Sequence, residues 1–436
     1  MREHLVEAVE ALYPLNRCLL GEGYDTALAF LKHLYPIEII EVESGTQFGT
    51  WTVPNEWIVR DAWVKNPSGK KITDYKEEPL SLVVGSLPYR GFVDLEELRK
   101  HWHYSEEMPN AIPYVFKYYD KDWGFCFPKD QIKEENKEVL SGVKLESGED
   151  FVPKYKDKLK KGKYEVFIDT EEVPGKLKIG VHTIKGKTDR EILLFAHLDH
   201  PFQANDNLSA VAALLEVAGR LKNGVDHTIK IIFCPETIGS IAYAFTQDLS
   251  KVDFVIATDI CGNNNDLLLQ IPLRESRLNS VAHLSVQGEG QSYRKAKFRS
   301  VIGSDEYVFN DPEIDIPAIM LSRHPYPEYH TSEDTPDKLD YDKIEETAKV
   351  IVKIIDVYER DYIPVRKFKG PLMRSRFGIQ TQNPQLNLAY DYLFYSIDGK
   401  KKLSELCVDF GLNFELTYDL MARLIEAKMI EKKNED

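Results

Sequence analysis

Residue types that bind metals cluster in one short segment of this 436-residue chain. The apolar run Ile192–Phe195 leads into His197-Leu198-Asp199-His200, and Asp206 follows on the polar turn Asn205-Asp206-Asn207. Imidazole and carboxylate groups are common zinc ligands, and a metal site needs a rigid element before one ligand and a short loop that returns a second. For His-x-Asp taken alone, a polar turn at a strand end explains the residues equally well. Further ligand residues at the same place are therefore required before this segment indicates a metal site.

Three more strand-like runs end in residues of the same types. Glu236 follows the run 231–234, Asp259 follows 254–258, and His330 lies in the loop after 318–321. Ligands of open α/β sheets bind where the carboxyl ends of the strands meet. A polar strand end explains any one of these residues, but four such ends in one domain indicate a functional site. We expect this site to combine His197, Asp206, Glu236, Asp259 and His330.

The region from about residue 164 to 358 alternates between strand and helix patterns. Short apolar runs separated by longer amphipathic segments predict an α/β fold with a sheet flanked by helices. The predicted strands are 177–181, 192–196, 229–233, 254–257, 267–271 and 318–321, and the predicted helices are 208–221, 238–247, 275–286 and 341–358.

Changes in pattern divide the chain into three predicted domains. Residues 37–104 hold short alternating runs and frequent turns, typical of a small β-rich domain. We predict that it is inserted into an α/β domain formed by 1–36 and 105–368. Residues 369–436 show three short helix patterns and a strand-like run, which resemble a winged helix. Acidic residues outnumber basic ones from Ile397 onward, so packing or dimerisation is favoured over DNA binding.

The composition limits the partners of the protein. The formal net charge of −15 argues against nucleic acid or an anionic membrane as the main partner. No apolar run is long enough to predict a transmembrane helix. The five cysteines are scattered without a pairing rhythm, which favours reduced thiols and a cytoplasmic protein. We expect a small-molecule or peptide substrate, and a homo-oligomer stays open.

The order of the motifs carries a family resemblance. Along the chain the motifs are His197-x-Asp199, Asn205-Asp206-Asn207, Glu236 with Gly239-Ser240, Asp259, and Tyr329-His330-Thr331. In this order they resemble the zinc aminopeptidase family, which includes leucyl aminopeptidases, glutamate carboxypeptidases and glutaminyl cyclases. Nearly the whole chain resembles a narrower aminopeptidase-like branch with an inserted β-domain and a C-terminal winged helix. The resemblance implies a zinc-peptidase-like mixed sheet and a hydrolase that binds one or two zinc ions.

The resemblance also implies roles for the site residues. His197 would bind metal, and Asp199 would orient its ring, because a carboxylate on an imidazole sets the tautomer and raises the basicity. Asp206 would bridge two ions. Asp259 would complete the first metal site, and His330 would bind the second.

The chain departs from the family pattern beside Glu236. The family places two adjacent glutamates here, one as general base and one as metal ligand, whereas this chain has Glu236-Thr237. A threonine hydroxyl is a poor zinc ligand. We predict that Glu236 is the general base for a metal-activated water; the alternative is that Glu236 is a ligand and no base remains. His200 is extra relative to the family, and it either fills the missing ligand position or is a turn residue.

Three functions stay open at this point. The first is a zinc aminopeptidase that cleaves an N-terminal amino acid or an aminoacyl amide. The second is a zinc-dependent amidase or deacylase acting on a sugar or peptide precursor. The third is a non-catalytic binding or regulatory relative, which Thr237 and the tail would suit.

Overall fold

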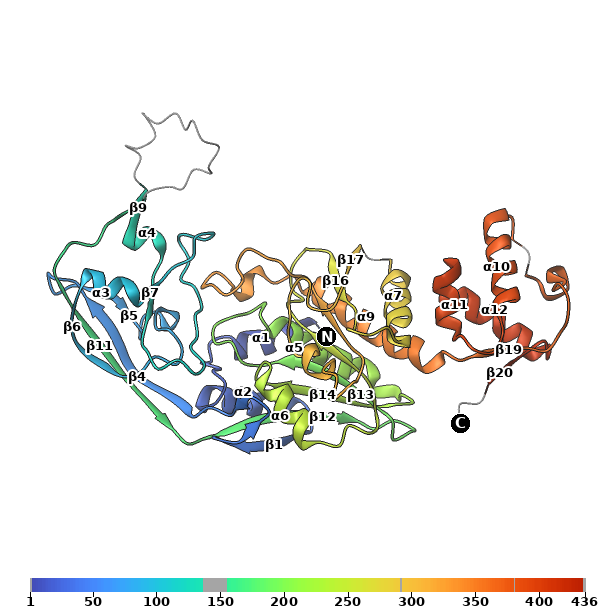
Figure 1. Ribbon diagram of the computed structural model, residues 1–436, viewed down its shortest axis with the longest axis horizontal. Coiled ribbons are helices and arrows are strands. Elements are labelled where there is room, and N and C mark those ends of the chain that lie inside the picture. The colour runs from blue at the N-terminus through green and yellow to red at the C-terminus, as the bar shows by residue number, and fades with distance from the viewer. Residues whose placement is uncertain (1, 136–154, 291, 380, 434–436) are drawn as a thin grey trace, which may run out of the picture.

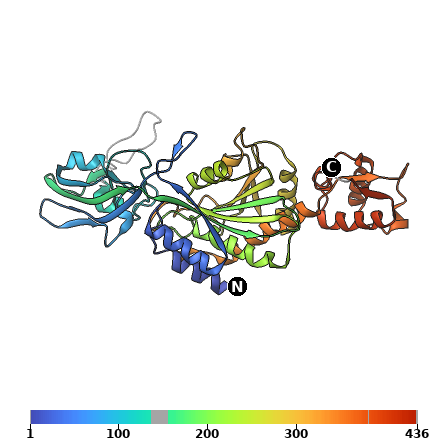
Figure 2. The same ribbon diagram turned by 90° about the horizontal axis from the view of Figure 1, so that it is seen from below.

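The computed structural model describes residues 2–135, 155–290, 292–379 and 381–433, which form three bodies in a row (Figure 1). An eight-stranded sheet with its helices forms the middle body. A four-stranded sheet forms the body at one end, and a helical tail forms the other end. Figure 2 shows helices on both faces of the central sheet.

The central sheet is mixed and places the predicted site residues at one edge. In order across the sheet its strands are β1 (Ile37–Glu43), β12 (Lys176–Ile184), β14 (Thr228–Cys234), β13 (Glu191–His197), β15 (Val252–Thr258), β18 (Ala318–Ser322), β16 (Leu267–Gln270) and β17 (Tyr293–Ala296). Strands β14, β13, β15 and β18 run parallel to one another. Each of the six predicted strands is present. Since the four parallel strands share a direction, their carboxyl ends meet, as open α/β sheets require.

Helices bury the two faces of this sheet in separate apolar clusters. One face is covered by α1 (Arg2–Leu12), α2 (Glu22–Leu34), α5 (Leu208–Arg220), α7 (Arg277–Gly288) and α9 (Tyr341–Arg360). The other face is covered by α6 (Ile238–Thr246) and the short α8 (Glu306–Phe309). Every residue of α5 from Leu208 to Ala218 is buried, because α1 and α9 pack over it. The predicted helices and the predicted mixed α/β fold are therefore confirmed.

The β-rich body is built from two distant parts of the chain. Its sheet has the order β5 (Lys71–Asp74), β4 (Glu56–Lys65), β11 (Lys163–Val173) and β6 (Tyr89–Asp94), and α3 (Leu95–Lys100) packs beside it. The pairing places β1 in the central sheet, although residues 37–104 are predicted as the insertion. It also places β11 in the β-rich body. The predicted domain boundaries stay a prediction.

Several short strands and one short helix complete the fold. They are β2 (Gln47–Phe48) paired with β3 (Trp51–Thr52), β7 (Trp102–His103) paired with β8 (Phe125–Cys126), β9 (Lys133–Glu135) paired with β10 (Tyr155–Asp157), and α4 (Lys129–Ile132). None of the helices in the described part of the chain combines the length and the apolar character that crossing a bilayer requires.

The tail contains the three predicted helices, α10 (Pro384–Ser396), α11 (Leu403–Phe410) and α12 (Phe414–Glu426). Its last strand, β20 (Ile430–Lys432), pairs with β19 (Pro364–Arg366), which precedes the helices. In a winged helix the strands of the wing follow the helices, whereas here one of the two paired strands precedes them. The predicted winged helix therefore stays a prediction.

A partly buried histidine just before β14 contacts the neighbouring elements, far from the predicted site. His227 Nε2 lies 2.9 Å from Asp253 Oδ2 on β15, and its Nδ1 lies 3.3 Å from Glu359 Oε1 on α9. Burial opposes protonation of this ring, but the two carboxylates outweigh it and raise the pKa of His227 to about 9. The folded protein therefore keeps this proton to a higher pH than an unfolded chain does.

We predict that His227→Asn destabilises the protein in a pH-dependent manner. The raised pKa contributes stability that is complete below the ordinary histidine pKa of about 6.5 and is lost as the pH rises through about 9. The substitution should cost about 1–2 kcal/mol at pH 6 and less than half of that at pH 9.5. Thermal unfolding of both proteins at the two pH values measures this. An equal loss at both would contradict the ion-pair explanation.

Candidate functional site

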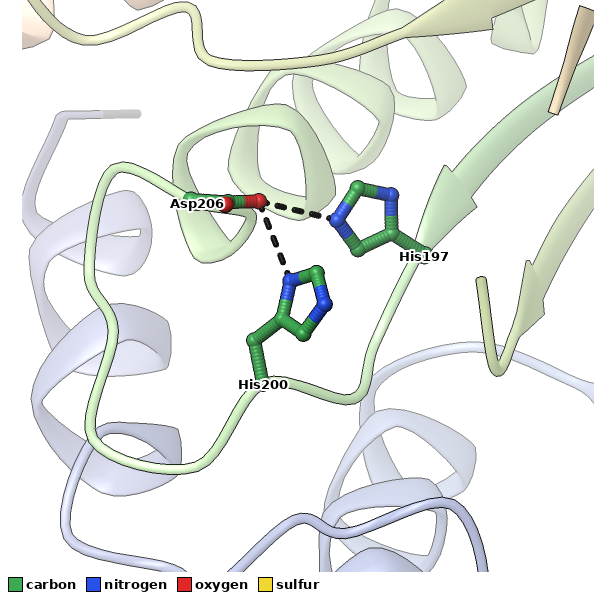
Figure 3. Close-up of side chains that lie close together, drawn as sticks. All are labelled: His197, His200 and Asp206. Atoms are coloured by element: carbon green, nitrogen blue, oxygen red, sulfur yellow. Dashed lines mark hydrogen bonds and ion pairs between the residues drawn. The ribbon is translucent and has the colours of Figure 1, made fainter. Parts of the chain in front are cut away.

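The Asp206 carboxylate lies at the centre of the site, with three imidazoles around it. Figure 3 shows His197 at the end of β13, with His200 and Asp206 on the loop that follows. His197 Nε2 lies 2.9 Å and His200 Nδ1 lies 3.2 Å from the same oxygen, Asp206 Oδ1. His330 Nε2 lies 2.9 Å from the other oxygen, Oδ2. The structure thus brings His197, Asp206 and His330 together and adds His200.

Asp259 and Glu236 complete the cluster from the two strands beside β13. Asp259 follows β15, and its Oδ1 lies 4.0 Å from His197 Nε2. Glu236 follows β14, and its Oε2 lies 3.5 Å from His200 Nε2. Asp259 is buried, whereas the Glu236 side chain is 27% exposed. Glu236 is therefore the acidic group of this cluster that a molecule entering from solvent can reach.

Asp199 supports Glu236 instead of His197. Its Oδ1 accepts a hydrogen bond of 2.8 Å from the Glu236 backbone N–H. The Nδ1 of His197 is contacted by the Asn207 amide at 3.1 Å and the Ser304 hydroxyl at 3.5 Å. The predicted role of Asp199 in orienting the His197 ring does not match these contacts. A one-dimensional spacing of two residues cannot tell which side of a loop the carboxylate faces.

Asp334 clamps the loop that carries Asp206. Its Oδ1 accepts from the Asn205 backbone N–H at 2.7 Å, and its Oδ2 accepts from the Asp206 N–H at 3.0 Å and from the Tyr326 hydroxyl at 2.7 Å. Burial raises the pKa of Asp334 to about 6, against the lowering effect of these donors. The sequence around Asp334 predicts only a turn, so this clamp is a tertiary feature.

Arg17 binds the backbone of the first part of the same loop, between Leu198 and Gln203. The buried guanidinium donates to the backbone carbonyls of Leu198 at 2.9 Å, His200 at 2.8 Å and Gln203 at 3.1 Å. Arg17 precedes α2, about 180 residues earlier in the chain. No local pattern around Arg17 indicates this contact, and sequence reasoning missed the residue.

The electrostatics of the cluster centre on Asp206. Burial disfavours a charged Asp206, but His200, His197 and His330 outweigh it and hold its pKa well below the usual value. Burial also opposes protonation of His197, yet Glu236 and Asp206 raise the pKa of that ring well above its usual value. For His200, burial is likewise outweighed, mainly by Asp206, and the pKa rises to about 9. Protons on these rings thus balance buried negative charge, and a bound cation would displace them.

The pKa shifts of the other three side chains of the cluster, Asp259, Glu236 and His330, favour their uncharged forms. Burial raises the pKa of Asp259 well above its usual value and also raises that of Glu236. Burial lowers the pKa of His330. Such shifts are expected where several like charges share a dry site.

The donor atoms fit a zinc ion. Tetrahedral zinc with bonds of about 2.0–2.2 Å places neighbouring ligand atoms roughly 3.3–3.6 Å apart. Ligand atoms of His197, His200 and Asp206 all lie within 4.8 Å of one another. The buried Asp259 Oδ1 has no hydrogen-bond partner among the described residues. A buried carboxylate oxygen without a partner, beside the group of His197, His200 and Asp206, fits a further metal ligand.

Comparison with solved structures defines the class of fold. A zinc aminopeptidase from Bacillus subtilis shares the fold with a TM-score of 0.57 and 14% identity, over 81% of this chain and 94% of that protein. The crystal structure of a Clostridium acetobutylicum protein, provisionally described as a peptidase, matches with a TM-score of 0.80 and 25% identity, over 99% of this chain and 96% of that one. The predicted resemblance to zinc aminopeptidases is confirmed at the level of the fold.

The chain belongs to the family described as a domain of unknown function (DUF4910), which matches residues 6–361. It is 28% identical to a Clostridium acetobutylicum protein, over 93% of this chain and 91% of that protein. That relative carries the provisional name of a polysaccharide biosynthesis protein with an aminopeptidase-like domain.

We predict that the protein binds zinc and that His200→Ala weakens binding at least about 10-fold, because His200 Nδ1 faces the same oxygen as His197. Asp206→Asn should abolish binding. Elemental analysis and chelator competition measure both effects. His182→Asn, whose ring faces the Pro36 carbonyl, is the control. Wild-type affinity in the His200 variant would make His200 a turn residue.

We predict that Asp334→Asn loosens the Asp206 loop. An amide offers one acceptor oxygen where three donors converge, so the variant should lose about 1–3 kcal/mol of stability and bind zinc about 10–100-fold more weakly. Thermal unfolding and zinc titration check this, with the exposed Asp337→Asn as control. Unchanged zinc affinity would limit Asp334 to a purely structural role.

Proposed function

We propose that the protein is a zinc-dependent hydrolase, most simply an aminopeptidase that releases an N-terminal amino acid from a peptide or an aminoacyl amide. The observation that carries this proposal is a buried carboxylate, Asp206, surrounded by three imidazoles, with the reachable Glu236 carboxylate 3.5 Å from one of them. The peptidase-type fold supports the choice of reaction.

The proposed ligands fall on the two sides of Asp206. His197 and His200 would hold an ion together with Asp206 Oδ1, and His330 and Asp259 offer further donors for the same ion or a second one. Bound zinc supplies Lewis acidity, which polarises a carbonyl and lowers the pKa of a nearby water to about 7. In this assignment His200 takes the ligand position that Thr237 leaves empty.

Glu236 would move the proton. Its backbone is held by Asp199, and its carboxylate is placed at the solvent side of the cluster. A carboxylate there can accept a proton from the attacking water and return it to the departing amine nitrogen. Because His200 can serve as the metal ligand, Glu236 can serve as the general base.

A second candidate is removal of an acyl group from an amino sugar. It is supported by the name of the Clostridium acetobutylicum relative, which refers to polysaccharide biosynthesis. The same residues would serve, since both reactions hydrolyse an amide. Parallel assays on aminoacyl amides and N-acetylated amino sugars separate the two candidates.

We predict that Glu236→Gln lowers kcat about 100–10,000-fold on whichever amide is hydrolysed, because the glutamine side chain cannot accept the proton. Zinc content and thermal stability should stay at wild-type values. Glu333→Gln, an exposed glutamate paired with Lys338 on the same loop as His330, is the matched control. A Glu236→Gln protein that loses both zinc and turnover, and recovers turnover in excess zinc, would identify Glu236 as a ligand. A zinc-loaded wild-type protein without turnover on either substrate class would favour the non-catalytic alternative.

A further inference from the structure

A small pocket opens beside the site and is lined by aromatic side chains from outside the central sheet. It has a volume of about 140 Å³ and reaches His200 and Glu236 at one end. Its walls include Trp51 from β3 and Tyr114, Phe116 and Tyr118 from the segment before β8. An apolar protein cavity of about 150 Å³ is large enough to bind benzene. The pocket therefore suits one apolar group of about that size next to the reactive centre.

A larger cavity adjoins this pocket, and its lining includes neither His200 nor Glu236. Its volume is about 390 Å³, within the range of small-molecule sites. Both cavities are lined by Cys18, Leu19, Val84, Lys117 and Tyr118. A molecule whose apolar unit fills the pocket thus has room to continue into the larger cavity.

The charges of the larger cavity are already balanced. Lys117 Nζ lies 2.6 Å from Asp122 Oδ2, and Lys121 Nζ lies 2.7 Å from Glu172 Oε2. A phosphate or a carboxylate would have to compete with these ion pairs. Uncharged polar groups such as peptide amides do not, so the walls favour a continuing peptide chain over an anionic group.

Tyr118 stands where the two cavities meet, and its hydroxyl is buried with no hydrogen-bond partner among the described residues. The ring is held edge-on to Trp51 at 5.6 Å between centroids and packs on Tyr119 at 4.8 Å. The neighbouring Tyr119 hydroxyl, by contrast, is satisfied by the backbone of Thr52. A buried polar group without a partner costs stability and is uncommon in folded proteins, so its orphaned state points to a ligand.

The Tyr118 hydroxyl carries a proton that no described residue accepts. Burial raises its pKa, and the nearby Tyr119 and Asp199 raise it further, so the phenol stays protonated at neutral pH. Among peptide groups, a carbonyl oxygen is the acceptor that such a donor matches.

We propose that Tyr118 donates a hydrogen bond to a backbone carbonyl of a peptide substrate, with an apolar residue in the small pocket and the following residues in the larger cavity. This inference rests on the proposed function for one point, which is the direction in which the peptide substrate runs through the two cavities. An aminopeptidase releases a residue that nothing precedes, so the continuing chain is the part after the scissile amide. The apolar residue is then the second residue of the peptide.

A length series with alanine amide, Ala-Phe-amide and Ala-Phe-Ala-amide tests this on the zinc-loaded protein. The wild-type kcat/KM should rise along the series. Tyr118→Phe, which keeps the ring, should lower kcat/KM about 10-fold for the tripeptide amide and less than about twofold for alanine amide. Tyr362→Phe is the matched control, because it removes another unpartnered buried hydroxyl, at the start of the tail. Ala-Glu-Ala-amide should be a poorer substrate than Ala-Phe-Ala-amide.

Calorimetry of Ala-Phe-Ala-amide on the Glu236→Gln protein, with and without zinc, separates this inference from the proposed function. Binding that Tyr118→Phe weakens about 5- to 10-fold, without turnover of any amide by the wild type, would keep the inference and reject the hydrolase. Turnover with equal effects of Tyr118→Phe on all lengths, or with none, would overturn the inference and keep the hydrolase. Neither binding nor turnover would reject both.

Discussion

The burial of one negative charge, the Asp206 carboxylate, is the constraint around which the site is built. An isolated carboxylate in a dry interior costs far more than a folded protein can tolerate, so it must be paired or bind a cation. Here three imidazoles supply the pairing. Helix α5 begins two residues later, and the partial positive charge of its N-terminus favours the same anion.

The surrounding structure keeps that charge in place. Strand β13 ends at His197 in the middle of the central sheet, so the first imidazole has a rigid base. The loop behind it has no regular structure and relies on two buried charged residues, Arg17 and Asp334, which bond its backbone from opposite ends of the sequence. Loops that carry functional groups need such support, because misplacement by a fraction of an ångström weakens a site.

A segment from outside the central sheet contributes aromatic side chains to the wall of the site. Aromatic residues between β7 and β8 lie against the imidazoles: the Tyr114 ring is 5.4 Å from that of His200 and 5.1 Å from that of His330. The backbone N–H of Tyr114 also donates to the His330 carbonyl at 2.7 Å. The cluster at the sheet edge is thus bordered by an aromatic segment that lies outside the central sheet.

The sequence by itself determined six of the eight strands of the central sheet, the longer helices that cover it and the positions of the candidate site residues after strand ends. These features are local: a continuous apolar run predicts a buried strand, and the residue after it must lie at the sheet edge. Strand β17, with the sequence Tyr-Arg-Lys-Ala, carries no such run and was not predicted. Only the tertiary structure decided the pairing of β1 and β11, the contact of Asp199 with Glu236, the turn of His200 toward Asp206, and the roles of Arg17 and Tyr118. Each of these depends on a partner far away in the chain or on which way a loop faces, and neither is encoded in the spacing of neighbouring residues.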